Sequence, residues 1–205
     1  MKHTLLALAA LACAAASPRA LRAQDARLDA RLDARTRDAV VALIDSARTD
    51  GIPSEPLVQK ALEGASKRAD DARILVAVRM LARELGDARA ALGASSSDAE
   101  VIAGASALHA GIKPAALSRM RASRAHGSLT VALAVLSDLI ARGVPGDTAT
   151  TVISALTVAG AQDAELLRFQ QGVERDIAQG ATPSAAIGVR AQGAFPTTTA
   201  PRRTP

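Results

Sequence analysis

The sequence predicts an all-α fold, an irregular array of antiparallel helical hairpins with about eight to nine short helices, solenoid-like or arranged as a compact bundle. Three observations lead to this prediction. Apolar residues recur with the 3.6-residue period of a helix along the chain. No segment shows the sustained apolar–polar alternation of a strand. A turn made of a helix end, a glycine and a proline returns several times.

Residues 1–24 have the features of a secretory signal peptide. Lys2 supplies the positive charge, residues 5–16 form an apolar run, and small residues follow. The apolar run is too short to be a permanent membrane anchor. We expect cleavage near Ala23 or Gln24, and therefore a periplasmic or secreted protein with no transmembrane span in the mature chain.

The single cysteine lies in this leader. An alternative to cleavage near Gln24 is a lipoprotein whose mature chain begins at an acylated Cys13. Removal of the whole leader leaves no cysteine, which excludes disulfides, thiolate nucleophiles and zinc sites built on cysteine. The leader also holds Lys2, Arg19 and Arg22, so the mature chain has 22 basic and 20 acidic residues. This balance argues against a nucleic-acid partner.

The remaining length is typical of one domain with a real core. We expect residues 25–193 to form a single α-helical domain and the Pro/Thr-rich residues 194–205 to be a disordered tail. The chain contains only two aromatic residues, Phe169 and Phe195. Sites that bind sugars, nucleobases or flat cofactors usually stack them on aromatic rings, so the composition favours a protein without a cofactor.

Residues 25–50 predict one first helix with a frayed start. Their repeat, DARLDARLDAR, places like charges four residues apart, which is unfavourable, whereas Asp33 and Arg37 form a favourable i,i+4 pair. We favour a solvated helix that leads into the core over a coiled-coil partner helix. Its apolar stripe continues through Thr36, Val40, Leu43, Ile44 and Ala47.

The clearest helix begins after Asp70 or Asp71, either of which is a suitable N-cap, and ends at Gly93. Its apolar residues are spaced alternately by four and three positions, which predicts a heptad-like buried seam. We expect Leu81 and Leu85, at the centre of the seam, to be core residues. The seam consists of Ile74, Val78, Leu81, Leu85, Ala88 and Leu92.

Similar signals predict the other helices. Ser54 is the expected N-cap of the second helix, with Pro56 in its first turn. The serines at 95–97 cap the fourth helix, and Glu100 lies in its first turn. Further helices are expected over residues 114–124, 128–142, 147–159, 162–179 and 183–191.

A recurrent turn separates these helices. Gly51, Gly111, Gly143 and Gly180 each follow a helix, where glycine readily adopts the left-handed C-cap conformation. A proline two or three residues later stops the helix, and the apolar residue between them packs back on the completed turn. The glycines are 60, 32 and 37 residues apart. This irregular spacing favours a hairpin array over a simple duplication.

The sequence shows no constellation typical of catalysis or metal binding. His109 and His126 have no ligand-type side chain at i+3 or i+4, and no nucleophile elbow or phosphate loop is present. We therefore expect a protein without a metal, a cofactor or an enzymatic activity. The alternative is a small helical hydrolase with an unrecognised site, in which Glu84 or Glu165 would be the carboxylate of a glycosidase.

One basic segment stands out, because residues 101–137 carry a net charge of +4 and no acid. Either it contacts an anion or acids of neighbouring helices balance its charge. The candidate anion contacts are Lys113, Arg119, Arg121, Arg124 and His126.

Together, these features predict an exported, non-enzymatic helical binding or scaffold module of the cell envelope. Its partner would be a protein or an anionic envelope component. The alternative is docking on anionic lipid or polysaccharide through residues 113–126.

Overall fold

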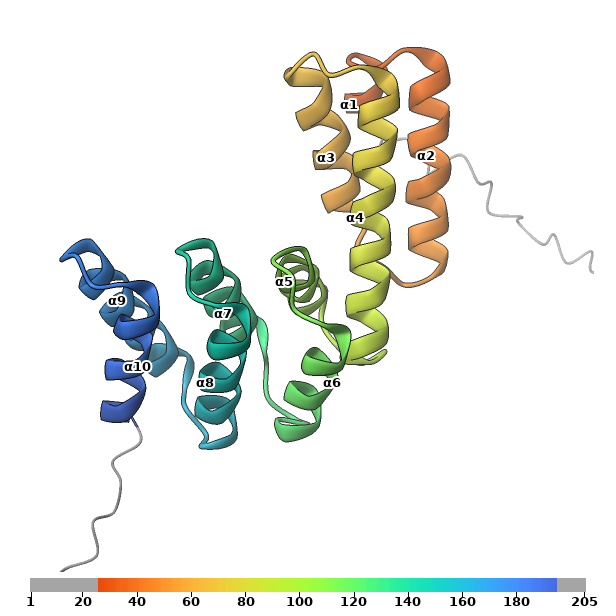
Figure 1. Cartoon of the computed structure of the whole chain (residues 1–205). Coiled ribbons are helices and arrows are strands. Elements are labelled where there is room, and N and C mark those ends of the chain that lie inside the picture. Colours follow the sequence, from red (N-terminus) through yellow and green to blue (C-terminus); the bar gives the residue numbers. More distant parts are fainter. Residues whose placement is uncertain (1–25, 195–205) are drawn as a thin grey trace, which may run out of the picture.

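The computed structural model describes residues 26–194, and this part of the chain is all-helical, with ten helices and no strand (Figure 1). The predicted leader, with Cys13, and residues 195–205 of the predicted tail lie outside the described residues. The helices are α1 (Ala26–Asp29), α2 (Ala34–Thr49), α3 (Glu55–Ser66), α4 (Asp71–Leu92), α5 (Asp98–His109), α6 (Pro114–Ser123), α7 (Thr130–Ala141), α8 (Gly146–Val158), α9 (Asp163–Ala178) and α10 (Pro183–Ala194).

The helices form two packed parts that share α4. Helices α1–α4 make an N-terminal bundle, and α5–α10 make an array of three hairpins that lie side by side (Figure 1). In the array, α5, α7 and α9 pack in succession as one layer, and α6, α8 and α10 form the other. One hydrophobic cluster runs through both parts, from Leu28 to Ile187. The predicted fold class is confirmed.

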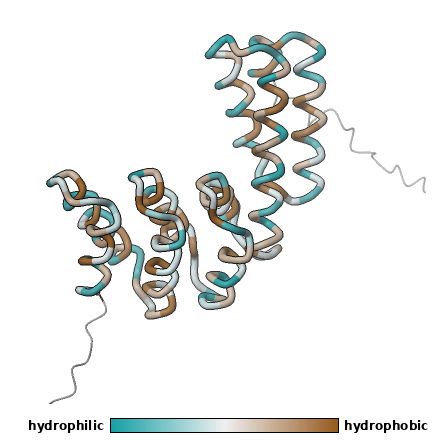
Figure 2. The backbone as a smooth tube through the Cα atoms, in the orientation of Figure 1, coloured by the Kyte–Doolittle hydropathy of each residue, from teal (hydrophilic) through white to brown (hydrophobic). Residues whose placement is uncertain are grey.

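Each helix buries one face and exposes the other. Figure 2 shows apolar stretches that recur along the helices between polar ones. The longest helix, α4, has 22 residues. Within residues 26–194, none of the helices combines the length and the apolar character that crossing a bilayer requires.

The recurrent glycine turns close the hairpins as predicted. At the end of α7, the Val144 amide donates to the Leu139 carbonyl over 3.0 Å and the Gly143 amide donates to the Ile140 carbonyl over 2.8 Å. These two bonds define a Schellman C-cap, which needs a residue with positive φ. Four glycines meet this need with φ between 66° and 99°, namely Gly51, Gly111, Gly143 and Gly180.

The array is more regular than the glycine spacing suggests. Its first-layer helices begin at Asp98, Thr130 and Asp163, which are 32 and 33 residues apart. Helices α5 and α7 have 12 residues and α9 has 16, so the last glycine is displaced by one helical turn. The three hairpins therefore follow one another with a nearly constant period.

The first predicted helix is divided in two. The chain leaves the helix after Asp29 and re-enters it at Ala34, because Asp33 is extended and its carboxylate accepts hydrogen bonds from the Arg35 and Thr36 amides. Among the described residues Arg37 forms ion pairs with Asp29 and Asp38, and the expected Asp33–Arg37 ion pair does not form.

This separate turn is anchored rather than frayed. Leu28 is fully buried, and Arg27 makes a two-pronged hydrogen bond to Glu55 at the start of α3. The pairing ties α1 to α3. The break at Asp33 gives the structure one helix more than the sequence predicts.

The predicted N-caps are confirmed at α4 and α5 but not at α3. The Asp70 carboxylate accepts from the Arg73 amide, and Ser97 forms a capping box with Glu100. Ser54 occupies the N-cap position of α3 without bonding its amides, and its hydroxyl accepts a hydrogen bond from Arg48.

The α4 seam is buried at every predicted position except one. Leu85 is fully buried, whereas Leu81 is only partly buried and packs at the edge of the core. The prediction that Leu81 is a central core residue is wrong, because α3 and α5 diverge at this level and leave a groove beside it.

We predict that Leu85→Ala lowers the free energy of unfolding by about 2–5 kcal/mol, because it removes buried surface and leaves a cavity. Leu81→Ala should cost less, under about 2 kcal/mol, since part of this side chain already meets solvent. Arg83→Ala, on the exposed face of the same helix, should change it by less than about 0.5 kcal/mol. Urea unfolding of the three variants checks this order, and equal effects at Leu81 and Leu85 would contradict it.

Candidate functional site

An apolar concave site lies at the inner corner between the N-terminal bundle and the hairpin array. We call it the elbow groove. It has a volume of about 360 Å³ and is bounded by the start of α3, the middle of α4 and the second half of α5. Figure 1 shows why it exists: α3 and α5 both pack against α4, but at different levels along it.

The floor of the groove is apolar. It is formed mainly by Ala77, Leu81 and Leu85 of α4 and by Ala105 of α5. Leu85 and Ala105 are buried members of the core, so part of the floor belongs to the packed interior, whereas Ala77 and Leu81 are partly exposed.

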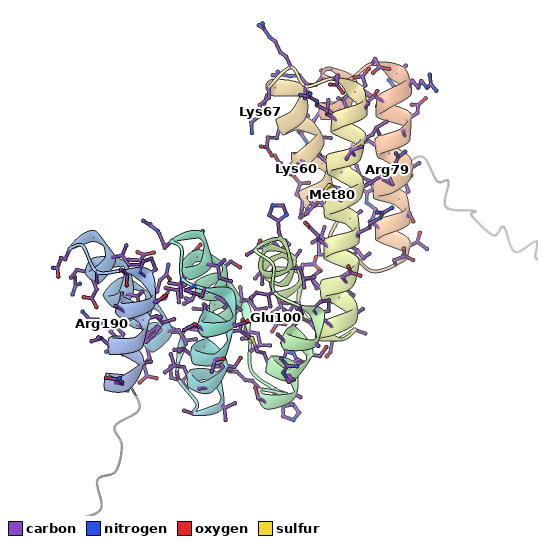
Figure 3. All side chains as sticks on the ribbon, viewed as in Figure 1. Lys60, Lys67, Arg79, Met80, Glu100 and Arg190 are labelled. Atoms are coloured by element: carbon purple, nitrogen blue, oxygen red, sulfur yellow. The ribbon has the colours of Figure 1, made fainter. Side chains whose placement is uncertain are left out.

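Two large apolar side chains stand on the edges of this floor. Met80 of α4 is 50% exposed and Ile102 of α5 is 40% exposed, and both line the groove. Solvated apolar side chains gathered around one concavity are typical of a binding surface. Figure 3 shows Met80 on α4 next to Lys60 on α3, which lines the same groove.

The exposed apolar position of Ile102 recurs in the next two hairpins. Ile102 is the fifth residue of α5, and the fifth residues of α7 and α9 are Ala134 and Leu167. All three are exposed, and Leu167 is 43% exposed. These residues occupy the same position in the first-layer helices of the three hairpins.

Lys60 contributes a charge that is already paired. It donates to Glu63 over 2.7 Å on the same helix, and Lys67 bonds the second oxygen of this carboxylate. The hydrogen bonds from Lys60 and Lys67 lower the pKa of Glu63 to about 2. This cluster therefore stays ionised and solvated at neutral pH.

The opposite wall holds a histidine–carboxylate pair. His109 Nδ1 of α5 lies 2.9 Å from Glu84 Oε1 of α4. Ser106 lies one turn before His109, but its hydroxyl donates to the Ile102 carbonyl over 3.1 Å. The three side chains thus do not form the relay that activates a serine nucleophile, in which the histidine bonds the hydroxyl.

Sequence reasoning missed the His109–Glu84 contact, because it searched for partners within one helical turn. The two residues are 25 positions apart and meet only in the α4–α5 packing. Glu165, the other proposed carboxylate, caps α9 by accepting from the Gln162 amide over 2.7 Å. Among residues 26–194, no group of three or more His, Cys, Asp or Glu side chains could hold a metal ion.

The predicted basic segment is divided between solvent and the interior. Lys113, Arg119 and His126 are exposed. Arg121 points inward and donates to Glu100 and to the Arg124 and Gly127 carbonyls. The structure therefore brings only part of the predicted anion contact to the surface.

Glu100 is the buried centre of this second network, and Figure 3 labels it within the array. Its carboxylate accepts from the Leu129 and Ser97 amides and from Arg121. Burial raises the pKa of Glu100, but these three donors lower it by more, so its net pKa lies below the usual value. The network joins the start of α5, the end of α6 and the start of α7.

Comparisons of the chain with protein-family models, with curated proteins and with solved structures found no match.

We predict that Glu100→Gln lowers the free energy of unfolding by about 3–5 kcal/mol at neutral pH, because it leaves Arg121 buried without a counter-charge. The folded pKa is below the unfolded value, so Glu100 stabilises the protein above the unfolded pKa, about 4.3, and this contribution is lost as the pH falls. Urea unfolding from neutral pH to below pH 4 measures this effect. The difference in the free energy of unfolding between wild type and Glu100→Gln should become smaller as the pH falls.

Glu165→Gln is the matched control, because Glu165 occupies the same capping position in α9 but is exposed. We expect it to cost about 1 kcal/mol or less. Equal losses for the two variants would contradict a special role for the Glu100 network.

Proposed function

We propose that this protein is an exported, non-enzymatic binding module of the cell envelope, and that the elbow groove holds a segment of a partner protein. The observation that carries this proposal is the exposure of Met80 and Ile102 on opposite edges of a preformed apolar groove. Large apolar side chains exposed around one concavity favour a binding surface.

The shape of the groove supports a polypeptide partner. It is open to solvent, and the exposed Ile102 of its edge has exposed apolar counterparts, Ala134 and Leu167, at the same position in α7 and α9. Helical-hairpin arrays characteristically present such extended surfaces to partners. The signal-like residues 1–24 support export to the envelope.

Docking on an anionic surface remains a separate hypothesis, and it rests on fewer residues than the sequence predicts. Lys113, Arg119 and His126 are exposed and make no ion pair within the described part of the chain. Arg121 is engaged with Glu100. The elbow groove therefore supports a function better than the basic segment does.

The proposal predicts where a partner can be cross-linked in intact cells. A photoreactive amino acid at Met80 or at Ile102 should yield the same cross-linked product. The matched control is Val158 of α8, which is 66% exposed and does not line the groove. Ile102→Glu should abolish the product obtained from Met80, since it places a charge on the apolar edge.

Two results would contradict the proposed function. The first is a product of equal yield from Val158, which would indicate non-specific contact. The second is no product from either groove position while the protein is present and folded in the envelope.

A further inference from the structure

We propose that the segment held in the elbow groove carries a lysine or arginine among apolar residues. Its cationic group pairs with Glu84, and its apolar residues pack on Met80 and Ile102. This inference rests on the proposed function, since it names the chemistry of the partner at the same site.

Glu84 is the one carboxylate among the residues that line the groove, and one of its oxygens is free to accept a hydrogen bond. Its Oε1 lies 2.9 Å from His109 Nδ1, and this contact holds the carboxylate on the wall. Its Oε2 makes no hydrogen bond within residues 26–194. An occupant of the groove can therefore bring a donor to Oε2 without displacing a group of the protein.

The surroundings of Glu84 make it unfavourable to cover this oxygen with apolar atoms. The side chain is only 23% exposed, and Met80 lies one turn before it on the same face of α4. A carboxylate that loses its remaining water needs a hydrogen bond or a counter-charge in exchange. A wholly apolar segment would supply neither, so the site favours an occupant with a donor at this position.

The other charged groups of the groove leave the charge of Glu84 in place. An imidazole at pH 8 is typically neutral, so the bond from His109 adds no positive charge there. Lys60, on the α3 wall, bonds Glu63 over 2.7 Å and forms no ion pair with Glu84 in the described structure. Glu63 lies outside the groove lining, as do the arginines of this part of α4. Within the groove, the missing counter-charge is therefore a positive one.

A lysine or arginine meets both requirements of the site. Its aliphatic stem packs on apolar surface while its cationic group donates hydrogen bonds. The stem would lie against Met80 and the groove floor, and the cationic group would reach Glu84 Oε2. A hydroxyl or amide could also donate, but a charge-assisted hydrogen bond to a carboxylate is stronger. The groove volume of about 360 Å³ suits a short segment of this kind.

Three short synthetic peptides test the inference. They share one sequence of leucine, alanine and serine with blocked ends, and they differ only at one central residue, which is lysine, glutamine or glutamate. Binding to the full mature protein is measured by fluorescence anisotropy at pH 8 and low salt. We expect the lysine peptide to bind about tenfold more tightly than the glutamine peptide, and the glutamate peptide to bind most weakly.

The direction of this preference is informative, because the chain carries a net positive charge. General electrostatic attraction to the protein would favour the glutamate peptide. A preference for the lysine peptide therefore reports a local negative site.

Two matched substitutions locate the effect on α4. Glu84→Gln removes the charge while keeping the size of the side chain, so the preference for lysine should disappear. Asp87→Asn removes the same charge three residues later, at an exposed position that does not line the groove, and should leave the preference as in wild type. Circular dichroism and urea unfolding check that both variants remain folded.

The inference is overturned if the three peptides bind equally or if none binds. It is also overturned if the preference for lysine persists in Glu84→Gln, or if Asp87→Asn removes it as well. In each case a cross-linked product from Met80 and Ile102 would leave the proposed function standing, so the two failures are distinguishable.

Discussion

The structure depends on α4 as one continuous helix that belongs to both parts of the molecule. Its first half packs with α2 and α3, and its second half carries α5 and α6 (Figure 1). Close contact with α5 requires Gly104, where a Cβ atom would lie 2.9 Å from Leu92 and 3.2 Å from Ala88. Because α3 and α5 pack on this common support at different levels, the groove between them is set by the fold and needs no partner to form it.

Two features at different places hold the helices of the array in position. Left-handed glycines close each hairpin, and the Glu100–Arg121 network joins α5 and α6 to the start of α7. Arg121 also holds the turn between α6 and α7 through the Gly127 carbonyl. The orientation of α5, and with it the position of Ile102, therefore rests on buried polar contacts as well as on apolar packing.

Local signals predicted nearly all of the helices, because caps, glycines and the apolar period act within a few residues. The break at Asp33 was not predicted, because the apolar period of a helix continues across it. The hydrogen bonds of this one aspartate to the following amides start a new helix there. The site was largely unpredicted. Leu81 followed the seam in sequence but borders the groove in space, and the Glu84–His109 and Glu100–Arg121 contacts join residues 25 and 21 positions apart. Such contacts depend on how helices cross, which the periodicity of a single helix does not contain.

The elbow between the two parts is expected to be rigid, because α3 and α5 share α4 as one support, and a distance distribution tests this most directly. Cysteines introduced at Gln59 of α3 and Gln171 of α9, both exposed, accept spin labels for pulsed dipolar spectroscopy of the mature chain. A reference pair at Ala134 and Gln171 reports the array alone. We predict a single narrow distribution for both pairs, and a shift of the first pair alone on Gly104→Ala, because the added Cβ displaces α5 from α4. A broad or multiple distribution for the first pair in the otherwise unchanged protein, beside a narrow reference, would contradict a preformed groove.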